Sequence, residues 1–315
     1  MIVTNCPLRV SLFGGSTDNP LFIERYGYGS VISFTCDLKT YVTIHEDKVG
    51  YNKHLHKYVL NYSIREEESF AKDIKNEVVR VVLEYFNIDP LTISLTSDVY
   101  SQGSGLASSS AYIISLIKAI SIKNELHLTD TEICLIALEL EQKFNPHCGL
   151  QDPFGCGVGG FKRIEFERNN KVRYTFLPTK IFDIYDMHLV FTGVNRNSKN
   201  VLKDVTNNIE KSRGLIQIVE LAQQALYNEE YELFLQYVSD SWKLKKETSN
   251  LITENVTVAE IDQILLDNPT VLAHKLCGAG NGGFYLVFSK KNCLTLSLPY
   301  IKINVSSSGV EGIKI

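Results

Sequence analysis

Hydrophobic and polar positions in the first part of the chain follow the pattern typical of β-strands. Residues 3–13, 30–36 and 40–45 are rich in β-branched and aromatic side chains and are bounded by Gly, Asn and Asp. Apolar residues at helical spacing over 76–85 predict a helix, and residues 91–95 predict a further strand. The N-terminal part is therefore expected to be built mainly around a sheet.

The remainder of the chain mixes long helical patterns with short strands. The predicted helices begin near Ser108 and cover 130–144, capped by Thr129 or Asp130, then 199–227, 230–248 and 258–266. A hairpin is predicted at 161–166 and 172–176, with strands at 188–192, 284–288 and 310–315. This order favours an α+β fold over repeating βα units. A boundary near residue 180 would give domains 1–180 and 181–315, although no flexible linker marks it.

Charge and cysteine content narrow the classes of partner. A net charge of −4 and a pI near 6.0 argue against a general attraction to nucleic acid or membranes. The basic cluster of Lys243, Lys245 and Lys246 lies in a helical pattern and is interpreted as a solvated face. There is no signal-peptide pattern, and no apolar run reaches the roughly 18 residues of a membrane span. Seven cysteines without a C-x-x-C pair indicate reduced thiols and a cytoplasmic protein.

The strongest chemical signal is the loop at 103–111, in which glycines and three serines precede a long apolar run. A helix that begins there would present unpaired N–H groups and a partial positive charge, which together favour phosphate. Serine hydroxyls at such a position can also contact a Mg²⁺ ion held by that phosphate. The loop is not a Walker A motif, because no Gly-Lys-Ser/Thr occurs in the chain.

Two further glycine clusters, at 155–160 and 278–283, match G-x-G-x-x-G. A dinucleotide fingerprint needs a helix after the glycines, whereas strand-like sequence follows both clusters, so the Rossmann interpretation fails. The second cluster has four glycines in six residues, which is costly in backbone entropy. It is interpreted either as a tight turn or as a loop whose backbone closes on a ligand.

Several charged residues have two interpretations when each is taken alone. Arg9 and Asp18 flank a strand that ends in Gly-Gly, and they could form an ordinary surface pair. Asp152 could be a turn-forming aspartate before proline, and Glu141 could belong to the polar face of its helix.

Taken together, the segments 7–18, 103–111 and 275–283 resemble the three motifs of the GHMP kinase superfamily, in order and in separation. Within the superfamily the chain is most similar to the heptose phosphate kinases, through the stretches 192–198, 241–246, 275–280 and 308–312. The resemblance implies a two-domain α+β GHMP kinase fold. The N-terminal domain would be like ribosomal protein S5 domain 2, and the C-terminal domain would be ferredoxin-like.

The resemblance also implies an ATP and Mg²⁺ site. The second motif would wrap the ATP phosphates through Gly103, Ser104, Gly105, Leu106, Ala107, Ser108, Ser109 and Ser110. The metal would be held by Ser110 and by Glu141, which lies eleven residues before the aspartate matched to the catalytic base. The third motif would shape the cleft and donate backbone N–H groups to phosphate from Gly278, Ala279, Gly280, Gly282 and Gly283.

On the acceptor side, the resemblance makes Asp152 the catalytic base and Arg9 the basic residue beside it. The sugar would be bound by the first motif and by one arginine, a set made of Gly14, Gly15, Ser16, Thr17, Asp18 and Arg196. A phosphorylated acceptor also needs cations, for which the candidates are Arg196, Arg163, Lys162 and Lys199. Two departures lie on this side: Ser16 replaces a common glycine, and residues 153–157 differ from the usual heptose kinase pattern.

The function that follows is an ATP-dependent kinase of a small-molecule sugar or sugar phosphate. The favoured reaction phosphorylates the anomeric hydroxyl of D-glycero-D-manno-heptose 7-phosphate to the 1,7-bisphosphate, for nucleotide-activated heptose and surface polysaccharide such as capsule or lipopolysaccharide. One alternative is a kinase of an unphosphorylated sugar such as galactose or fucose. A more distant alternative is a non-catalytic nucleotide- or sugar-binding protein. The oligomeric state is not readable from the sequence.

Overall fold

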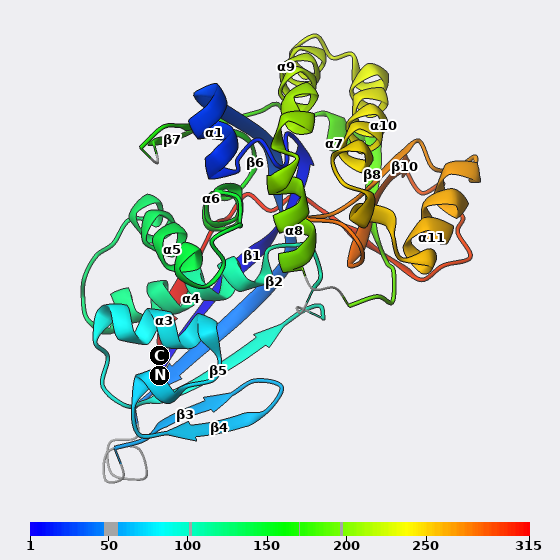
Figure 1. Ribbon diagram of the computed structural model, residues 1–315. Coiled ribbons are helices and arrows are strands. Elements are labelled where there is room, and N and C mark those ends of the chain that lie inside the picture. The colour runs from blue at the N-terminus through cyan, green and yellow to red at the C-terminus, as the bar shows by residue number, and fades with distance from the viewer. Residues whose placement is uncertain (47–55, 101–102, 170, 196–197) are drawn as a thin grey trace.

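Two sheets form the framework of the protein (Figure 1). The computed structural model describes residues 1–46, 56–100, 103–169, 171–195 and 198–315. The first sheet has the order β12-β1-β2-β5-β3-β4, with β6 paired to β2 and β7 paired to β6, and the second has the order β11-β8-β10-β9. With helices packed on these sheets, the expected α+β class is confirmed.

The first sheet contains β1 (Ile2–Phe13), β2 (Tyr28–His45), β3 (Tyr58–Asn61), β4 (Arg65–Glu68), β5 (Thr92–Ser97), β6 (Phe161–Glu167), β7 (Lys171–Phe176) and β12 (Glu311–Lys314). The second sheet contains β8 (Tyr185–Phe191), β9 (Ala273–Leu276), β10 (Phe284–Lys290) and β11 (Tyr300–Ile303). The strand pairs are antiparallel apart from β3 with β5. The predicted hairpin of β6 and β7 is confirmed.

Strand β2 is a single long strand where the sequence predicts two. Its first part pairs with β6 and its last part pairs with β5, both on the side opposite β1. The polar segment 37–39, which separates the two predicted strands, lies opposite a register shift in β1 between Pro7 and Arg9. Because a bulge absorbs local irregularity and bends a strand without ending it, β2 continues through this segment.

The helices are α1 (Pro20–Tyr26), α3 (Glu77–Phe86), α4 (Ser108–Lys123), α5 (Asp130–Phe144), α6 (Gln151–Gly157), α7 (Ile181–Ile184), α8 (Ser198–Asn207), α9 (Arg213–Tyr227), α10 (Tyr231–Thr248) and α11 (Val256–Asp267). Helix α4 packs on β1 and β2, and α3, α5 and α6 pack around it on the same face (Figure 1). Its apolar residues Ile113, Leu116, Ile117 and Ile120 have no exposed surface. Each contributes about 1.5–3 kcal/mol by burial, which fixes the N-terminus of α4 in the sheet framework.

The predicted continuous helix over 199–227 is wrong. The chain forms α8, then a short 3₁₀ segment (Ile209–Ser212), and then α9. At the break, Asn208 leaves the helical region with φ −112° and ψ 33°, and its amide donates to the carbonyl of Asp204 at 3.0 Å. An asparagine side chain competes for backbone hydrogen bonds in this way, and periodicity alone does not register it.

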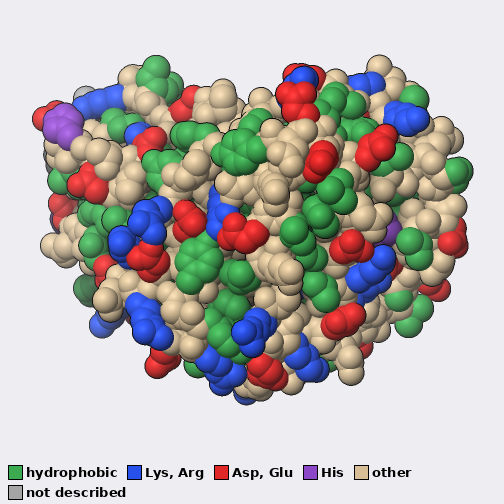
Figure 2. Space-filling model, turned by 90° about the horizontal axis from the view of Figure 1, so that it is seen from above, with side chains coloured by type: hydrophobic (Ala, Val, Ile, Leu, Met, Phe, Trp, Pro, Cys, Tyr) green, Lys and Arg blue, Asp and Glu red, His purple; other side chains and the backbone are tan. Residues whose placement is uncertain are grey.

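The end of the chain returns to the first sheet, because β12 pairs with β1 and Ile315 N–H donates to Met1 O (Figure 1). The boundary proposed near residue 180 falls between β7 and α7. Within the described ranges, no helix combines the length and the apolar character that a membrane crossing requires. All seven cysteines are free thiols, and only Cys293 is exposed. In Figure 2, basic and acidic side chains are interspersed over the face that is shown.

Candidate active site

A cleft of about 760 Å³ brings the three sequence motifs together. Its walls include residues from 9–19 at the end of β1, from 103–109 at the start of α4, and from 275–279 after β9. The connection from α5 to α6, the start of α3, and residues of α8, α9 and α10 also line the cleft. Segments that are far apart in the sequence therefore converge on one cavity, and the candidate residues can be considered as one site.

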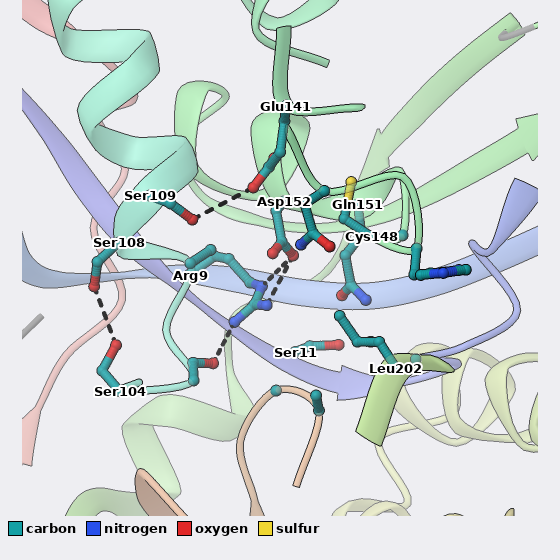
Figure 3. Close-up of a pocket in the computed structure, with 18 of the residues that line it drawn as sticks. Arg9, Ser11, Ser104, Ser108, Ser109, Glu141, Cys148, Gln151, Asp152 and Leu202 are labelled. Carbon is teal, nitrogen blue, oxygen red and sulfur yellow. Dashed lines mark hydrogen bonds and ion pairs between the residues drawn. The ribbon is translucent and has the colours of Figure 1, made fainter. Parts of the chain in front are cut away.

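Arg9 and Asp152 form the centre of the cleft (Figure 3). Arg9 Nε and Nη2 donate to Asp152 Oδ1 at 3.0 and 2.7 Å, while Nη1 donates to the carbonyl of Gly105 at 2.6 Å. Burial disfavours the charged guanidinium, but the Asp152 carboxylate outweighs it and raises the pKa of Arg9 above its usual value. Both bonds end on Oδ1, so among the described residues Oδ2 keeps its lone pairs for a substrate hydroxyl.

Asp18 holds the start of the helix that carries Asp152. Its carboxylate accepts from the N–H of Gln151, the first residue of α6, at 3.1 Å and from the N–H of Ser16 at 3.0 Å. Asp18 is only 1% exposed, and burial together with the charge of Asp152 raises its pKa. Asp18 lines the cleft as predicted, and the structure adds a second role for it, because it fixes the N-terminus of α6.

The predicted phosphate loop lies at the N-terminus of α4. Ala107 precedes the helix in a left-handed conformation (φ 63°), and no side chain caps the first turn. Ser104 and Ser108 bond to each other at 3.0 Å on the cleft wall, while Leu106 is buried and its carbonyl accepts from the N–H of Arg9. An uncapped start of a long helix facing a cleft offers N–H groups and a positive dipole end to an anion.

Ser110 and Glu141 meet beside this loop, as predicted for the metal site. Ser110 Oγ donates to Glu141 Oε2 at 2.6 Å. Ser109 Oγ lies 3.4 Å from Glu141 Oε1 (Figure 3). Burial, and then the charge of Asp152, raises the pKa of Glu141 to about 8. A buried carboxylate with hydroxyl neighbours is a set of hard oxygen donors, and Mg²⁺ fits it with phosphate and water as its other ligands. Among the described residues, no group of three or more His, Cys, Asp or Glu side chains is arranged to hold a metal ion by itself.

The third motif forms the turn between β9 and β10, in agreement with the strand-like sequence after it. Gly278 and Ala279 line the cleft. The N–H of Gly283 donates to Val194 O, so it is not available to a phosphate as the sequence suggested. This part of the motif instead packs on the second motif, with Phe284 N–H donating to Ser104 O at 3.1 Å.

Several predicted acceptor-side residues are not brought to the cleft. Thr17 is fully buried, with its hydroxyl bonded to the carbonyls of Gly14 and Ser30, and Gly14 packs against Ser30 beneath the loop. Arg163 donates to Glu220, and the buried Lys162 ammonium donates to the carbonyls of Gly155 and Gly160. The remaining candidates, Arg196 and the side chain of Lys199, lie outside the described residues.

Sequence reasoning missed Lys245 and Lys275 as residues that line the cleft. Lys275 of β9 donates to the carbonyls of Ser11 and Leu12 at 2.9 and 2.7 Å. Lys245 of α10 also lines the cleft and donates to Ser16 Oγ, so its interpretation as part of a solvated face is wrong. Both lysines belong to stretches that support the family resemblance, 241–246 and 275–280. Membership of these stretches was the signal from which both could have been predicted as site residues.

Replacing Gly283 by alanine is expected to destabilise the protein and weaken ATP binding. Gly283 has φ +91°, and a Cβ there would lie 2.4 Å from Ser104 O, so the second motif must shift. Gly27→Ala is the matched control, since it has φ +81° but no atom within 4 Å of the new Cβ. Strain alone costs about 1–2 kcal/mol, and G283A should exceed this in thermal denaturation and raise the Kd for ATP. Equal effects of the two variants would contradict the close packing of the motifs.

Comparison with known proteins shows which family of enzymes has a domain similar to the part of the chain that carries this site. The family description "GHMP kinases N terminal domain" matches residues 73–160, which include α4 with its glycine-serine loop, Glu141 and Asp152. The chain carries a GHMP kinase domain. The enzyme is therefore a phosphotransferase.

Relatives of this kinase extend the similarity over nearly the whole chain. It is 28% identical over 305 residues to D-glycero-alpha-D-manno-heptose 7-phosphate kinase of Campylobacter jejuni, covering 91% of this chain and 89% of that protein. It is 29% identical to L-fucokinase/L-fucose-1-P guanylyltransferase of Bacteroides fragilis, over 60% of this chain and 21% of that larger protein. The crystal structure of a D-glycero-D-manno-heptose 1-phosphate kinase from Bacteroides thetaiotaomicron has the same fold, with a TM-score of 0.78, 21% identity, and coverage of 100% and 99%.

Proposed function

We propose that the protein transfers the γ-phosphoryl group of ATP to the anomeric hydroxyl of D-glycero-D-manno-heptose 7-phosphate, giving the 1,7-bisphosphate. The observation that carries the proposal is the Arg9–Asp152 pair, which lies in the cleft beside the glycine-serine loop that precedes α4. The relative named as a heptose 7-phosphate kinase, matched over nearly its full length, supports the choice of acceptor. We further propose that the product feeds the synthesis of nucleotide-activated heptose for surface polysaccharide.

The proposed mechanism assigns a role to each polar group that takes part in it. Asp152 Oδ2 accepts the proton of the attacking hydroxyl as its oxygen bonds to the γ-phosphorus and the β–γ bridging bond breaks to release ADP. Arg9 holds Asp152 in place and offsets negative charge on the transferring group. The α4 N-terminus binds the nucleotide phosphates. Glu141 and Ser110 would hold Mg²⁺, which, when bound, neutralises charge on the phosphates.

A kinase of an unphosphorylated sugar is the second candidate, favoured by the similarity to the fucokinase of Bacteroides fragilis. The first test is a panel of sugars and sugar phosphates incubated with Mg²⁺-ATP. We expect heptose 7-phosphate to be turned over with kcat/KM at least about tenfold above any unphosphorylated sugar, because a phosphate adds charge-assisted contacts. Turnover of galactose or fucose without turnover of heptose 7-phosphate would contradict the proposed acceptor. Nucleotide binding without any turnover would favour a non-catalytic protein.

A further inference from the structure

The cleft extends beyond the Arg9–Asp152 pair on the side away from the phosphate loop, and we call this part its acceptor end. Relative to the Arg9–Asp152 pair, the serines of the phosphate loop lie on one side and Leu202 on the other (Figure 3). The lining of the cleft also includes Ser16 of the first motif, Asn19 directly after it and Lys245 of α10. The first motif and α10 meet at the cleft, where Lys245 donates to the Ser16 hydroxyl.

The basic side chains in this part of the cleft come from α10 and β9. The described Lys and Arg side chains that line the cavity are Arg9, Lys75, Arg80, Lys245 and Lys275. Arg9 is paired with Asp152, and Arg80 is held at the start of α3 by the carbonyl of Ile74. Lys245 is close enough to affect the pKa of both Asp18 and Lys275. Burial, together with repulsion by Lys245 and Arg9, lowers the pKa of Lys275 to about 7, so these three basic groups lie close enough to repel one another.

Ser16 is held in a conformation that a serine rarely adopts. Its φ is 85°, in the left-handed region where glycine is unstrained, and a residue with a side chain costs about 1–2 kcal/mol there. Its hydroxyl meets Lys245 Nζ at 2.5 Å across 229 positions of sequence. A serine that retains this strain places a hydroxyl beside a cleft lysine, where glycine would place none.

We propose that Lys245 and Ser16 form the subsite for the phosphate ester of the acceptor. This inference rests on the proposed function and identifies the acceptor class as a phosphorylated sugar. The ammonium of Lys245 would bind the ester as a point charge, and the Ser16 hydroxyl would donate to a second phosphate oxygen. A dianion there also relieves the repulsion among Lys245, Lys275 and Arg9. The subsite selects the acceptor, while Asp152 carries out the chemistry.

The test compares KM and kcat for two acceptors that differ only in the ester, D-glycero-D-manno-heptose 7-phosphate and D-glycero-D-manno-heptose. Lys245→Gln is expected to raise KM for the phosphate by about 10- to 100-fold, with kcat and the KM of the free sugar little changed. Lys243→Gln is the matched control, because Lys243 lies two residues away on α10, is 64% exposed and pairs with Asp240. Equal KM changes for the two acceptors, or equal effects of the two variants, would overturn the subsite.

A second variant separates binding from folding. Ser16→Gly removes the hydroxyl and relieves the strain, so we expect unchanged or higher thermal stability together with a raised KM for heptose 7-phosphate only. An unchanged KM would remove Ser16 from the subsite. Calorimetric titration of heptose 7-phosphate into the wild type and K245Q with ADP present gives a readout without turnover. Binding that depends on Lys245 but is not followed by turnover would support the subsite and refute the proposed function. Turnover together with binding that does not depend on Lys245 would support the proposed function and refute the subsite.

Discussion

Replacing Asp152 by asparagine is expected to lower kcat by about 10²- to 10⁴-fold while ATP binding persists. Asparagine keeps the shape of the side chain, and its amide oxygen can still accept from Arg9 Nε and Nη2, which now bond to Asp152 Oδ1. The amide cannot take a proton from the attacking hydroxyl. The loss should therefore fall on kcat and not on the affinity for nucleotide, as measured by steady-state kinetics and by titration with ATP.

The control for this variant is Asp240→Asn, which removes a carboxylate on α10 that pairs with the exposed Lys243. D240N should leave kcat unchanged. Thermal denaturation of D152N shows whether the fold has survived the loss of the ion pair with Arg9. A folded D152N enzyme with wild-type kcat would refute the assignment of Asp152 as the base.

Replacing Glu141 by glutamine is expected to abolish most activity and yet stabilise the metal-free protein at alkaline pH. The raised pKa of Glu141, about 8, lies above that of an unfolded glutamate, so the folded state holds this proton more tightly. Folded stability is therefore undiminished at acid pH and falls as the pH rises from about 4.5 through 8. E141Q removes this loss, a gain on the order of 5 kcal/mol above pH 8. Without the carboxylate ligand, turnover with Mg²⁺-ATP should fall by at least about 100-fold.

The measurements are thermal denaturation between pH 5 and 9 without metal, and turnover with Mg²⁺-ATP. Glu139→Gln is the matched control, because Glu139 lies on the same helix, is exposed and pairs with Lys143. E139Q should match the wild type in both measurements. A parallel pH dependence for E141Q and the wild type would show that Glu141 is not the buried acid that the geometry indicates.

Local patterns were sufficient for the parts of the site that lie within one element. The start of α4 at Ser108 followed from the glycine-serine loop and the apolar run behind it. The start of α5 followed from Thr129, which forms a capping box with Glu132. The pairing of Ser110 with Glu141 was implied by the family resemblance, and the structure brings the two side chains together.

Contacts between distant elements could not be predicted in this way. Asp152 and Pro153 suggested a turn, yet they begin α6, because proline is tolerated in the first turn of a helix and Asp18, far away in sequence, binds the N–H of Gln151. Lys245 has the periodicity of a solvated face, and only the docking of α10 against Ser16 makes it part of the cleft. Periodicity shows which face of a helix is polar, but it does not show what that face meets.

The most direct test of the central claim is the structure of the product formed from D-glycero-D-manno-heptose 7-phosphate and Mg²⁺-ATP. Phosphorus–proton correlation NMR of the purified product identifies the carbon that carries the new ester. The account predicts a second phosphate coupled to the proton on C1, formed in one-to-one stoichiometry with ADP and absent when D152N replaces the wild type. A new phosphate at any other carbon, or ADP released without a phosphorylated sugar, would contradict it.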